Sequence, residues 1–422
     1  MPFLDNLSDL IWSLPTVLLI ISVGIYYTIR LRFPQVRWLG QMLRTVRKSL
    51  FGDGENRFRV LSTALAATVG TGSVAGVATA ITLGGAGAVF WLWVSAFLGM
   101  AVSFAEGVLS IEYRDGKKGG IMYAIRDGMG EGFLAKLYAF FTVLAPFGMG
   151  GMVQSNSAAE AIRLESGISP AAVGLALALL TAACLFSGRD FTGRASSIMM
   201  PILTVIYIFA VTAVIVVNFY KLPTVFGTIF RSAFGLRPIA GAAIGISVRE
   251  AVSVGFKRGV FSNEAGLGTT AAIHAGSGLT PREQGLMNMF EVVVDTFVIC
   301  TLTALAILAS GATETGLDGA LLVSAACESV FGDFSGTVIA LCTAGFATAT
   351  IIGWSKIGLS AAEYLSERSV LLYKLALTTA VFTGAVVSLS AAWKVSDIFN
   401  GLMVFPCVGA LWELRKVVVR QV

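Results

Sequence analysis

The chain has 422 residues, of which 56% are hydrophobic and 13% are charged. Soluble globular domains average roughly 45–50% apolar and about 25% charged residues, so this composition excludes a soluble fold. The net charge of +5 could suggest nucleic-acid binding, but basic loops of membrane proteins usually report topology, and we favour that interpretation. A single histidine, His274, excludes a multi-histidine metal cluster, and five scattered cysteines without a CxxC pair indicate neither disulfides nor zinc.

Apolar runs long enough to cross a bilayer core of about 30 Å as helices recur down the whole chain. We therefore predict an all-α polytopic membrane protein with eleven transmembrane helices. Segments 36–50 and 222–234 are too short or too mixed to span and are placed at the membrane surface, while 319–334 is predicted to be an outer loop with a short helix. The predicted spans are 10–30, 58–83, 87–112, 133–158, 170–187, 196–219, 239–275, 285–311, 335–362, 370–392 and 396–414.

The distribution of Lys and Arg predicts the orientation of these spans. With the N-terminus outside, the inner segments hold 20 basic residues and the outer segments hold five, among them Lys394. Cytoplasmic loops carry the excess of basic residues, so we expect the N-terminus outside and the C-terminus in the cytoplasm of a multi-pass cell-membrane protein.

Ten spans remain when the first is left aside, and they divide into two sets of five. An odd number of spans per half gives the halves opposite orientations, as in inverted-repeat transporters. We expect an N-terminal transmembrane helix and basic amphipathic segment over 1–57, a first repeat over 58–219, an extracellular connection over 220–238, and a second repeat with the C-terminal tail over 239–422.

A glycine-rich stretch, 68–76, lies about ten residues into the predicted span that begins at Phe58. At 1.5 Å per residue, Gly70 and Gly72 fall near the middle of the membrane. Unwinding there would free amide groups that favour a carboxylate and carbonyls that can bind a cation. The alternative is a stripe of small residues that only packs against a neighbouring helix.

The second half offers two places for a matching break. The same offset, counted from Pro238, falls on 251–259, and a second glycine-rich stretch, 262–268, follows within ten residues. On this offset argument, the first and sixth helices of the ten-helix core are both discontinuous. Stretch 251–259 is then the midplane break, and 262–268 belongs to the inner half-helix or its mouth.

Four strings of the sequence, GTGSVAGVATAI, GFKRGVFSNEAGLGTTAAIHA, FEVVVDTFVICTLTAL and TIIGWS, resemble signatures of the sodium:alanine symporter family, also called alanine or glycine:cation symporters. The resemblance runs from about Phe58 to the last helices. It implies a leucine-transporter-type fold of five plus five inverted helices. It also implies a secondary active transporter that couples inward sodium movement to uptake of alanine or glycine by alternating access, with Na⁺ and no organic cofactor.

The resemblance also implies a substrate site. Backbone groups of the first break would bind the substrate carboxylate, and residues of the second half would bind its amino group and pack against its small side chain. A pair of polar side chains would face the pocket, and a tryptophan indole would cap it. A bulky indole beside small residues leaves room for little more than a methyl group. For Trp354 the alternative is an anchor at the membrane interface. The implied residues are Gly70, Thr71, Gly72, Ser253, Gly255, Phe256, Gln154, Asn156 and Trp354.

Sodium, by the same resemblance, would lie between carbonyls of the first break and hydroxyls of the eighth core helix. This implies the carbonyls of Ala66 and Val69 with the hydroxyl of Thr348 or Thr350. A second ion would use Thr68, the substrate carboxylate and position 73. The family usually has Asn there, whereas this chain has Ser73, which puts the second ion in question.

Acidic residues inside apolar runs are costly and therefore candidates for function. Glu106 lies in the third span, and Glu291 and Asp295 are spaced four apart in the eighth. Asp295 could serve an ion site. Alternatively, these acids form structural ion pairs with nearby basic residues, namely Arg249, Lys257 and Arg258.

Three other functions remain at this stage. A transporter of the same fold could be driven by protons or could carry another small amine. An intramembrane enzyme would need a nucleophile with a base, or facing carboxylates, at membrane depth, and the chain shows neither pattern. A passive channel is not favoured, because two unlike halves do not suggest a symmetric pore. We expect the amino acid, sodium and the lipid bilayer as partners, and no nucleic acid.

Overall fold

The computed structural model describes residues 2–51, 70–116, 118–187, 191–235, 247–269, 272 and 276–421. Over these ranges the secondary structure is helical apart from one isolated bridge between Asp115 and Lys118. The helices are α1 (Pro2–Ile11), α2 (Leu14–Arg30), α3 (Pro34–Arg37), α4 (Leu39–Phe51), α6 (Val77–Gly84), α7 (Gly87–Glu112), α8 (Ile121–Tyr123), α9 (Gly132–Ala145), α10 (Val153–Ser166), α11 (Pro170–Ser187), α12 (Phe191–Val217), α13 (Leu222–Ala233), α14 (Val248–Asn263), α16 (Pro281–Val292), α17 (Thr301–Ser310), α18 (Gly319–Phe331), α19 (Phe334–Leu365), α20 (Glu367–Val386), α21 (Leu389–Glu413) and α22 (Arg415–Val419).

Four further segments are wound more loosely, as π-helix. They are η1 (Gly72–Gly76), η2 (Ala124–Gly128), η3 (Pro146–Met152) and η5 (Val293–Cys300). Segment η3 joins α9 to α10 and begins at a proline, while η5 joins α16 to α17. Two short turns of 3₁₀-helix, η4 (Phe219–Lys221) and η6 (Ala312–Thr315), complete the set. Because π-helical turns are frequent at functional sites, η1, η3 and η5 indicate where a functional site could lie in the bundle.

Nine helices in the described part of the chain are long and apolar enough to cross a membrane. They coincide with nine of the eleven predicted spans. The other two, 58–83 and 239–275, fall partly on residues outside the described ranges. The short helix predicted within 319–334 is confirmed as α18, and segments 36–50 and 222–234 form the short helices α4 and α13. Their place at the membrane surface stays a prediction.

One predicted boundary is wrong. The last two long helices separate at Ser388, whose hydroxyl accepts a hydrogen bond from the Ala391 amide, and Lys394 lies inside α21. The Ser388 side chain caps the start of α21 and so favours a helix from Leu389 onward. Lys394 does not interrupt this helix, because its long side chain can carry the charge away from the apolar surface. Lys394 therefore does not belong to a loop.

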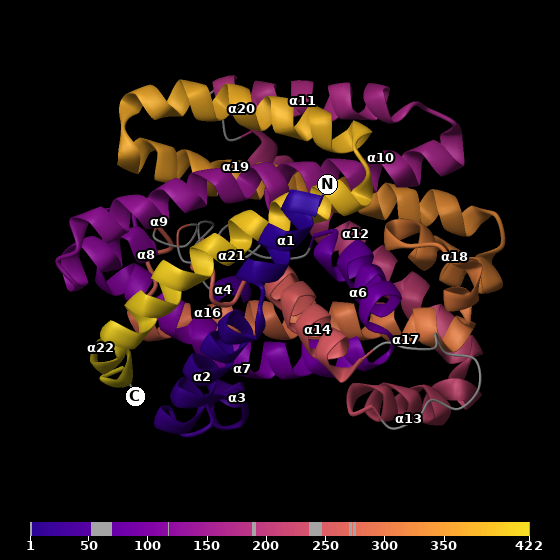
Figure 1. Ribbon diagram of the computed structural model, residues 1–422, viewed down its shortest axis with the longest axis horizontal. Helices are drawn as coiled ribbons and strands as arrows, with labels where there is room; N and C mark the ends of the chain where they lie inside the picture. The colour runs from indigo at the N-terminus through magenta and orange to yellow at the C-terminus, as the bar shows by residue number, and fades with distance from the viewer. Residues whose placement is uncertain are drawn as a thin grey trace.

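The long helices run across the molecule in roughly one direction (Figure 1). Helices α11 and α20 pack against each other at the top of that view, α7 lies at the bottom, and α10, α19 and α21 lie between them. The short helices gather at the ends: α8 and α22 at the left with the C-terminus, α13 and α18 at the right. The surface helices predicted to be outside thus lie at the end opposite the C-terminus.

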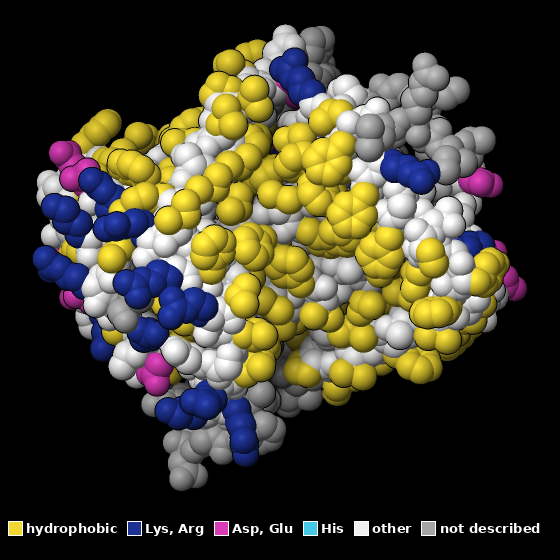
Figure 2. Space-filling view, turned by 90° about the horizontal axis from the view of Figure 1, so that it is seen from below, with side chains coloured by type: hydrophobic (Ala, Val, Ile, Leu, Met, Phe, Trp, Pro, Cys, Tyr) yellow, Lys and Arg dark blue, Asp and Glu magenta, His cyan; other side chains and the backbone are white. Residues whose placement is uncertain are grey.

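The surface divides in the same direction. Figure 2 shows hydrophobic side chains over the middle of one face and most Lys and Arg side chains at its left end, the end that carries the C-terminus. Large apolar side chains are exposed on the outer helices, for example Leu179, Phe209 and Leu372 at 62%, 67% and 70%. Such a surface fits a lipid bilayer, and the chain is a multi-pass membrane protein.

Candidate functional site

The described part of the first glycine-rich stretch, which begins at Gly70, brings two predicted site residues together. Gly70, Thr71 and Gly72 are buried where the chain enters η1. The Thr71 amide and hydroxyl both donate to Gln154 Oε1, at 3.3 Å and 2.8 Å, and Gln154 Nε2 donates to the Met149 carbonyl at 3.0 Å. The amide side chain of α10 is therefore oriented by η3 and holds the first turn of the half-helix.

Thr350 of α19 lies against the same turn. A methyl group in place of the Gly70 hydrogen would come 2.5 Å from Thr350 Oγ1. This hydroxyl is buried and has no hydrogen-bond partner within the described ranges, which begin again at Gly70. The Thr348 hydroxyl, in contrast, donates to the Ala344 carbonyl of its own helix at 2.7 Å. Of the two predicted threonines, only Thr350 offers a free oxygen at the break.

The other predicted sodium ligands of the first half, Ala66, Thr68 and Val69, lie outside the described residues. Ser73 is described and donates to Asp295 Oδ1 at 2.5 Å. The site can thus be judged only from Gly70 onward.

Asp295, in η5, joins the two halves. The side chain is fully buried, and its Oδ2 atom accepts hydrogen bonds from Ser262 at 2.7 Å and Thr296 at 2.9 Å. With the bond from Ser73, its two oxygens connect η1, the end of α14 and η5. Buried carboxylates are usually paired with a cation, yet the donors that surround this one are neutral hydroxyls.

Two of the three basic residues considered as partners of these acids, Lys257 and Arg258, are used elsewhere. Lys257 and Arg258 both form ion pairs with Asp397 Oδ2 of α21, each at 2.9 Å. The interpretation of Asp295 as a structural partner of Lys257 or Arg258 is therefore wrong.

The second break lies later in the chain than the offset argument predicts. Helix α14 is continuous from Val248 to Asn263, and its C-cap, Glu264, takes the left-handed conformation with φ of 58°. Gly255 and Gly259 serve a different purpose, since methyl groups there would come 2.6 Å from the Ala88 carbonyl and 2.7 Å from Ser95 Oγ. The prediction of a break at 251–259 is wrong because these glycines let α14 approach α7.

This shift changes which residues of the second half meet the first break. Gly255 faces α7, and Phe256 is buried 6.3 Å, ring to ring, from Trp91 of that helix. Within the described residues, Gly255 and Phe256 therefore contact α7 and not the stretch from Gly70 to Gly76. Phe261 and Ser262 lie there instead: a methyl group on Gly72 would come 3.1 Å from the Phe261 ring and 3.3 Å from the Ser262 Cα.

Two buried carboxylates hold the second break. Glu106 Oε1 of α7 accepts the amides of Gly266 and Gly268, at 2.8 Å and 2.9 Å. Glu264 Oε1 accepts Trp354 Nε1 at 3.1 Å, and its other oxygen accepts the Thr269 hydroxyl. The glycine-rich loop is thus fixed by α7 on one side and α19 on the other.

Trp354 and Asn156 take different places from those implied by the resemblance. The Trp354 side chain is fully buried and lies against Gly150 of η3, so it is not an anchor at the membrane interface. Asn156 Nδ2 donates to the Gly384 and Val387 carbonyls at the end of α20, at 3.0 Å and 2.7 Å. Trp354 joins the second break, whereas Asn156 ties α10 to α20.

The functional residues that sequence reasoning missed are Phe261, Ser262 and Glu264. All three lie next to or within the second glycine-rich stretch, 262–268, and the signal that could have found them was its three small residues around an acid in an apolar run. In the described part of the chain, no group of three or more His, Cys, Asp or Glu side chains could hold a metal ion.

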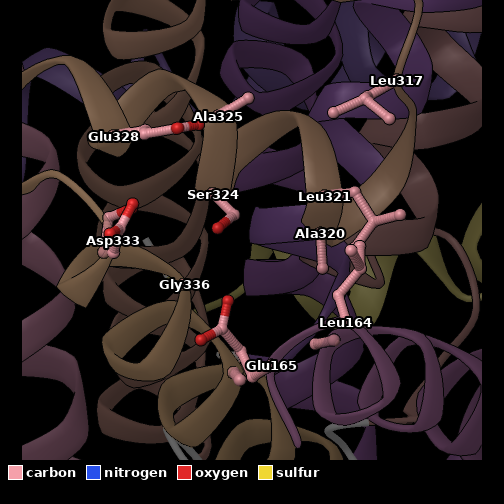
Figure 3. Close-up of a pocket in the computed structure, with 13 residues that line it drawn as sticks. Leu164, Glu165, Leu317, Ala320, Leu321, Ser324, Ala325, Glu328, Asp333 and Gly336 are labelled. Carbon is pink, nitrogen blue, oxygen red and sulfur yellow. The ribbon is translucent and has the colours of Figure 1, made fainter. Parts of the chain in front are cut away.

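A separate pocket of about 290 Å³ lies between α10, α18 and α19 (Figure 3). Three acidic side chains line it, Glu165, Glu328 and Asp333. Glu165 accepts a hydrogen bond from Thr337 at 3.1 Å, and all three acids are exposed. None of the residues that line it belongs to stretch 70–76 or stretch 262–268.

Comparison with known proteins shows which family the chain resembles. The profile described as the sodium:alanine symporter family matches residues 1–422. The sodium/alanine symporter AgcS of Methanococcus maripaludis is 38% identical over 99% of this chain and 95% of its own length. A Bacillus subtilis protein named as a candidate sodium/proton-dependent alanine carrier, YrbD, is 36% identical over 98% of this chain and 90% of its own length.

Solved structures support the architecture. A manganese transporter of Eremococcus coleocola superposes with a TM-score of 0.57 at 15% identity, covering 87% of this chain and 80% of that one. At this level of identity the similarity concerns the fold alone. The chain therefore shares the helical arrangement of a known class of membrane transporters.

Proposed function

Because the chain belongs to the sodium:alanine symporter family, we propose that it takes up alanine or glycine by alternating access, driven by sodium moving down its gradient. Members of the family are transporters, so the chain is not an intramembrane enzyme. The observation that carries the proposal is the first break, where buried backbone, the Gln154 side chain and the unpartnered Thr350 hydroxyl converge.

The substrate carboxylate binds at the start of the outer half-helix. The first turn of a helix has amides without helical partners, and the helix dipole favours a negative charge there. Gly70, Thr71 and Gly72 expose this backbone, and Gln154 fixes the orientation of Thr71. The substrate's amino group then lies toward carbonyls and hydroxyls at the end of α14.

The small size of the substrate follows from what lies across from Gly72. The Phe261 ring and the Ser262 backbone already lie 3.1 Å and 3.3 Å from the position of a methyl group on Gly72. A pocket closed by an aromatic ring and glycine backbone accepts a hydrogen atom or a methyl group and rejects longer side chains. Alanine and glycine fit this limit.

One sodium ion binds between the carbonyls before Gly70 and the Thr350 hydroxyl. Among the described residues, Thr350 Oγ1 is a neutral oxygen without a hydrogen-bond partner. A buried oxygen of this kind is stabilised by a hard monovalent cation, whereas an apolar neighbour would leave it unsatisfied. Thr348 takes no part, because its hydroxyl is used by its own helix.

Asp295 forms the second cation site. It holds a carboxylate against the hydroxyls of Ser73, Ser262 and Thr296, and a bound cation would balance its charge. Ser73, where the family usually has Asn, keeps contact with this acid. The site can take either sodium or a proton, and this is the specific observation that favours the proton-coupled alternative as a second candidate.

The two breaks also support the proposed five-plus-five inverted repeat, with its halves at 58–219 and 239–422. One break lies in each half, and Phe261 and Ser262 of the second face Gly72 of the first. The end that carries most of the basic side chains and the C-terminus is then cytoplasmic, and the N-terminus is outside.

The test is uptake of radiolabelled alanine into proteoliposomes under an imposed sodium gradient, with a proton gradient as the second arm. We expect accumulation that requires sodium and is inhibited by glycine. Uptake that ignores sodium and follows the pH gradient would replace the sodium mechanism by the proton-coupled one. No alanine uptake under either gradient contradicts the proposed substrate.

A further inference from the structure

A buried charge cluster links α14 and α21 outside the two breaks. Lys257 and Arg258 share one carboxylate, Asp397, whose side chain is 4% exposed. The side chains of Lys257 and Arg258 are 14% and 3% exposed. Among the described side chains of this cluster, two cations therefore face one anion, at a place where an unbalanced charge is costly.

The same cluster contains hydrogen-bond donors without acceptors. Arg258 donates Nη2 to Asp397, but its Nε and Nη1 atoms are buried and have no partner among the residues that the structure describes. Trp393 Nε1, also buried, has none either, and the Arg258 guanidinium carbon lies 3.8 Å from the centre of the Trp393 ring. Leaving such donors unsatisfied is expensive. Because the unpaired atoms of Arg258 and Trp393 are all donors, the missing partner is an acceptor, and the excess positive charge makes it an anion.

The cluster lies one aromatic layer from the first break. The Trp393 ring packs edge to face on Phe261, with centroids 4.5 Å apart, and lies 3.5 Å from the position of a methyl group on Gly76. Phe261 in turn covers Gly72. A small ligand on the Arg258 side of Phe261 is therefore adjacent to the proposed substrate site and separated from it by one ring.

We propose that Arg258 and Trp393 form an outer subsite that holds the carboxylate of the amino-acid substrate before it passes Phe261 to the first break. This inference rests on the proposed function, because it takes its ligand from the transported substrate. The N-terminal segment covers the subsite: Trp12 Nε1 donates to the Asp397 carbonyl at 2.7 Å, and Lys257 donates to Ser8 at 2.9 Å. The ligand enters when this segment moves aside.

The sharpest variant is Trp393→Phe, which removes the unpaired N–H and keeps an aromatic ring beside Arg258 and Phe261. Arg258→Lys is the second variant, because it keeps the charge and removes the planar donors. The matched control is Trp93→Phe, since Trp93 Nε1 already has a partner, Thr301, at 2.8 Å. Sodium-driven alanine uptake in proteoliposomes gives KM and the maximal rate for each, and thermal unfolding in detergent checks that each protein is folded.

We expect Trp393→Phe and Arg258→Lys to raise the KM for alanine by about tenfold, the effect of one lost charge-assisted hydrogen bond, with the maximal rate of Trp393→Phe retained. Trp93→Phe should leave both values unchanged. A KM within twofold of the parent protein for folded Trp393→Phe overturns the inference.

Replacing chloride by gluconate distinguishes an inorganic anion from the substrate. If uptake by the parent protein depends on chloride and Trp393→Phe loses that dependence, the subsite binds chloride and the inference is overturned. If uptake is indifferent to chloride while the KM shift persists, the carboxylate assignment holds. A parent protein without sodium-driven uptake contradicts the proposed function instead, so the two failures are distinguishable.

Discussion

The two helix breaks at the centre of the molecule are built in opposite ways. At the first, small residues meet neutral groups, and one buried hydroxyl, Thr350 Oγ1, has no partner. At the second, the amides of Gly266 and Gly268 are satisfied by Glu106, and Glu264 is satisfied by Trp354 and Thr269. Buried polar groups are normally paired. Glu106 Oε2 and Asn263 Nδ2 also lack a partner among the described residues, so the two breaks differ in their backbone: the amides of the second are bound by a carboxylate of the protein.

This difference suggests a division of labour between the halves. The second break is a rigid support, because buried carboxylates fix its backbone between α7 and α19. The first break presents Gly72 to the Phe261 ring and the Ser262 backbone. A transporter needs both, since a ligand site can change partners during the cycle only if a stable frame keeps the two breaks facing each other.

The largest expected effect comes from filling the first break. Gly72→Leu places a side chain against the Phe261 ring and the Ser262 backbone, which lie 3.1 Å and 3.3 Å from its Cβ. We expect alanine binding and uptake to be abolished, because the backbone can no longer approach a carboxylate. Equilibrium binding of radiolabelled alanine measures this. Gly227→Leu is the control, as nothing lies within 4 Å of its Cβ, and normal alanine binding by Gly72→Leu would show that the site lies elsewhere.

Substitutions that disturb the second break should lower the free energy of unfolding, and not only the affinity for the ligand. Glu106→Ala leaves the Gly266 and Gly268 amides without an acceptor, and we expect a loss of about 2–4 kcal/mol in the free energy of unfolding. Glu106→Gln keeps a carbonyl oxygen and should lose less. Thermal unfolding in detergent compares the two. If alanine and glutamine variants are equally stable, the carboxylate does not hold the loop.

A smaller effect should separate the two threonines of α19. Thr350→Val removes the unpartnered hydroxyl at Gly70, and we expect the sodium concentration for half-maximal uptake to rise by about tenfold. Thr348→Val is the matched control on the same helix and should leave that concentration unchanged, because its hydroxyl serves the Ala344 carbonyl. The reverse result would move the ion to Thr348 and away from the first break.

Much of the architecture was predictable because it depends on local composition. The nine spans found among the described residues, the amphipathic helix α4 and the outer helix α18 all follow from the length and polarity of continuous segments. The loose winding of Gly72–Gly76 follows from the same local cause, since several glycines in a short apolar stretch weaken a helix. The break itself stays a prediction, because the residues before Gly70 lie outside the described ranges. The resemblance implied Gln154, which contacts Thr71, whereas Trp354 donates to Glu264 after α14.

The rest depended on neighbours that are distant in sequence. Gly255 and Gly268 look alike in the chain, yet Gly255 stays helical against the Ala88 carbonyl while Gly268 takes φ of 74° and donates to Glu106. Asn156 follows Gln154 by two residues and therefore points to another side of α10, toward α20.

The sequence by itself thus determined that this protein is a helical membrane protein with weakened helices, because hydrophobicity and glycine content act locally. Only the tertiary structure decided which glycines break a helix and which let helices approach. It also decided that Asp295 meets hydroxyls while Asp397 meets two cations, because hydrogen bonds and ion pairs form between segments brought together by packing.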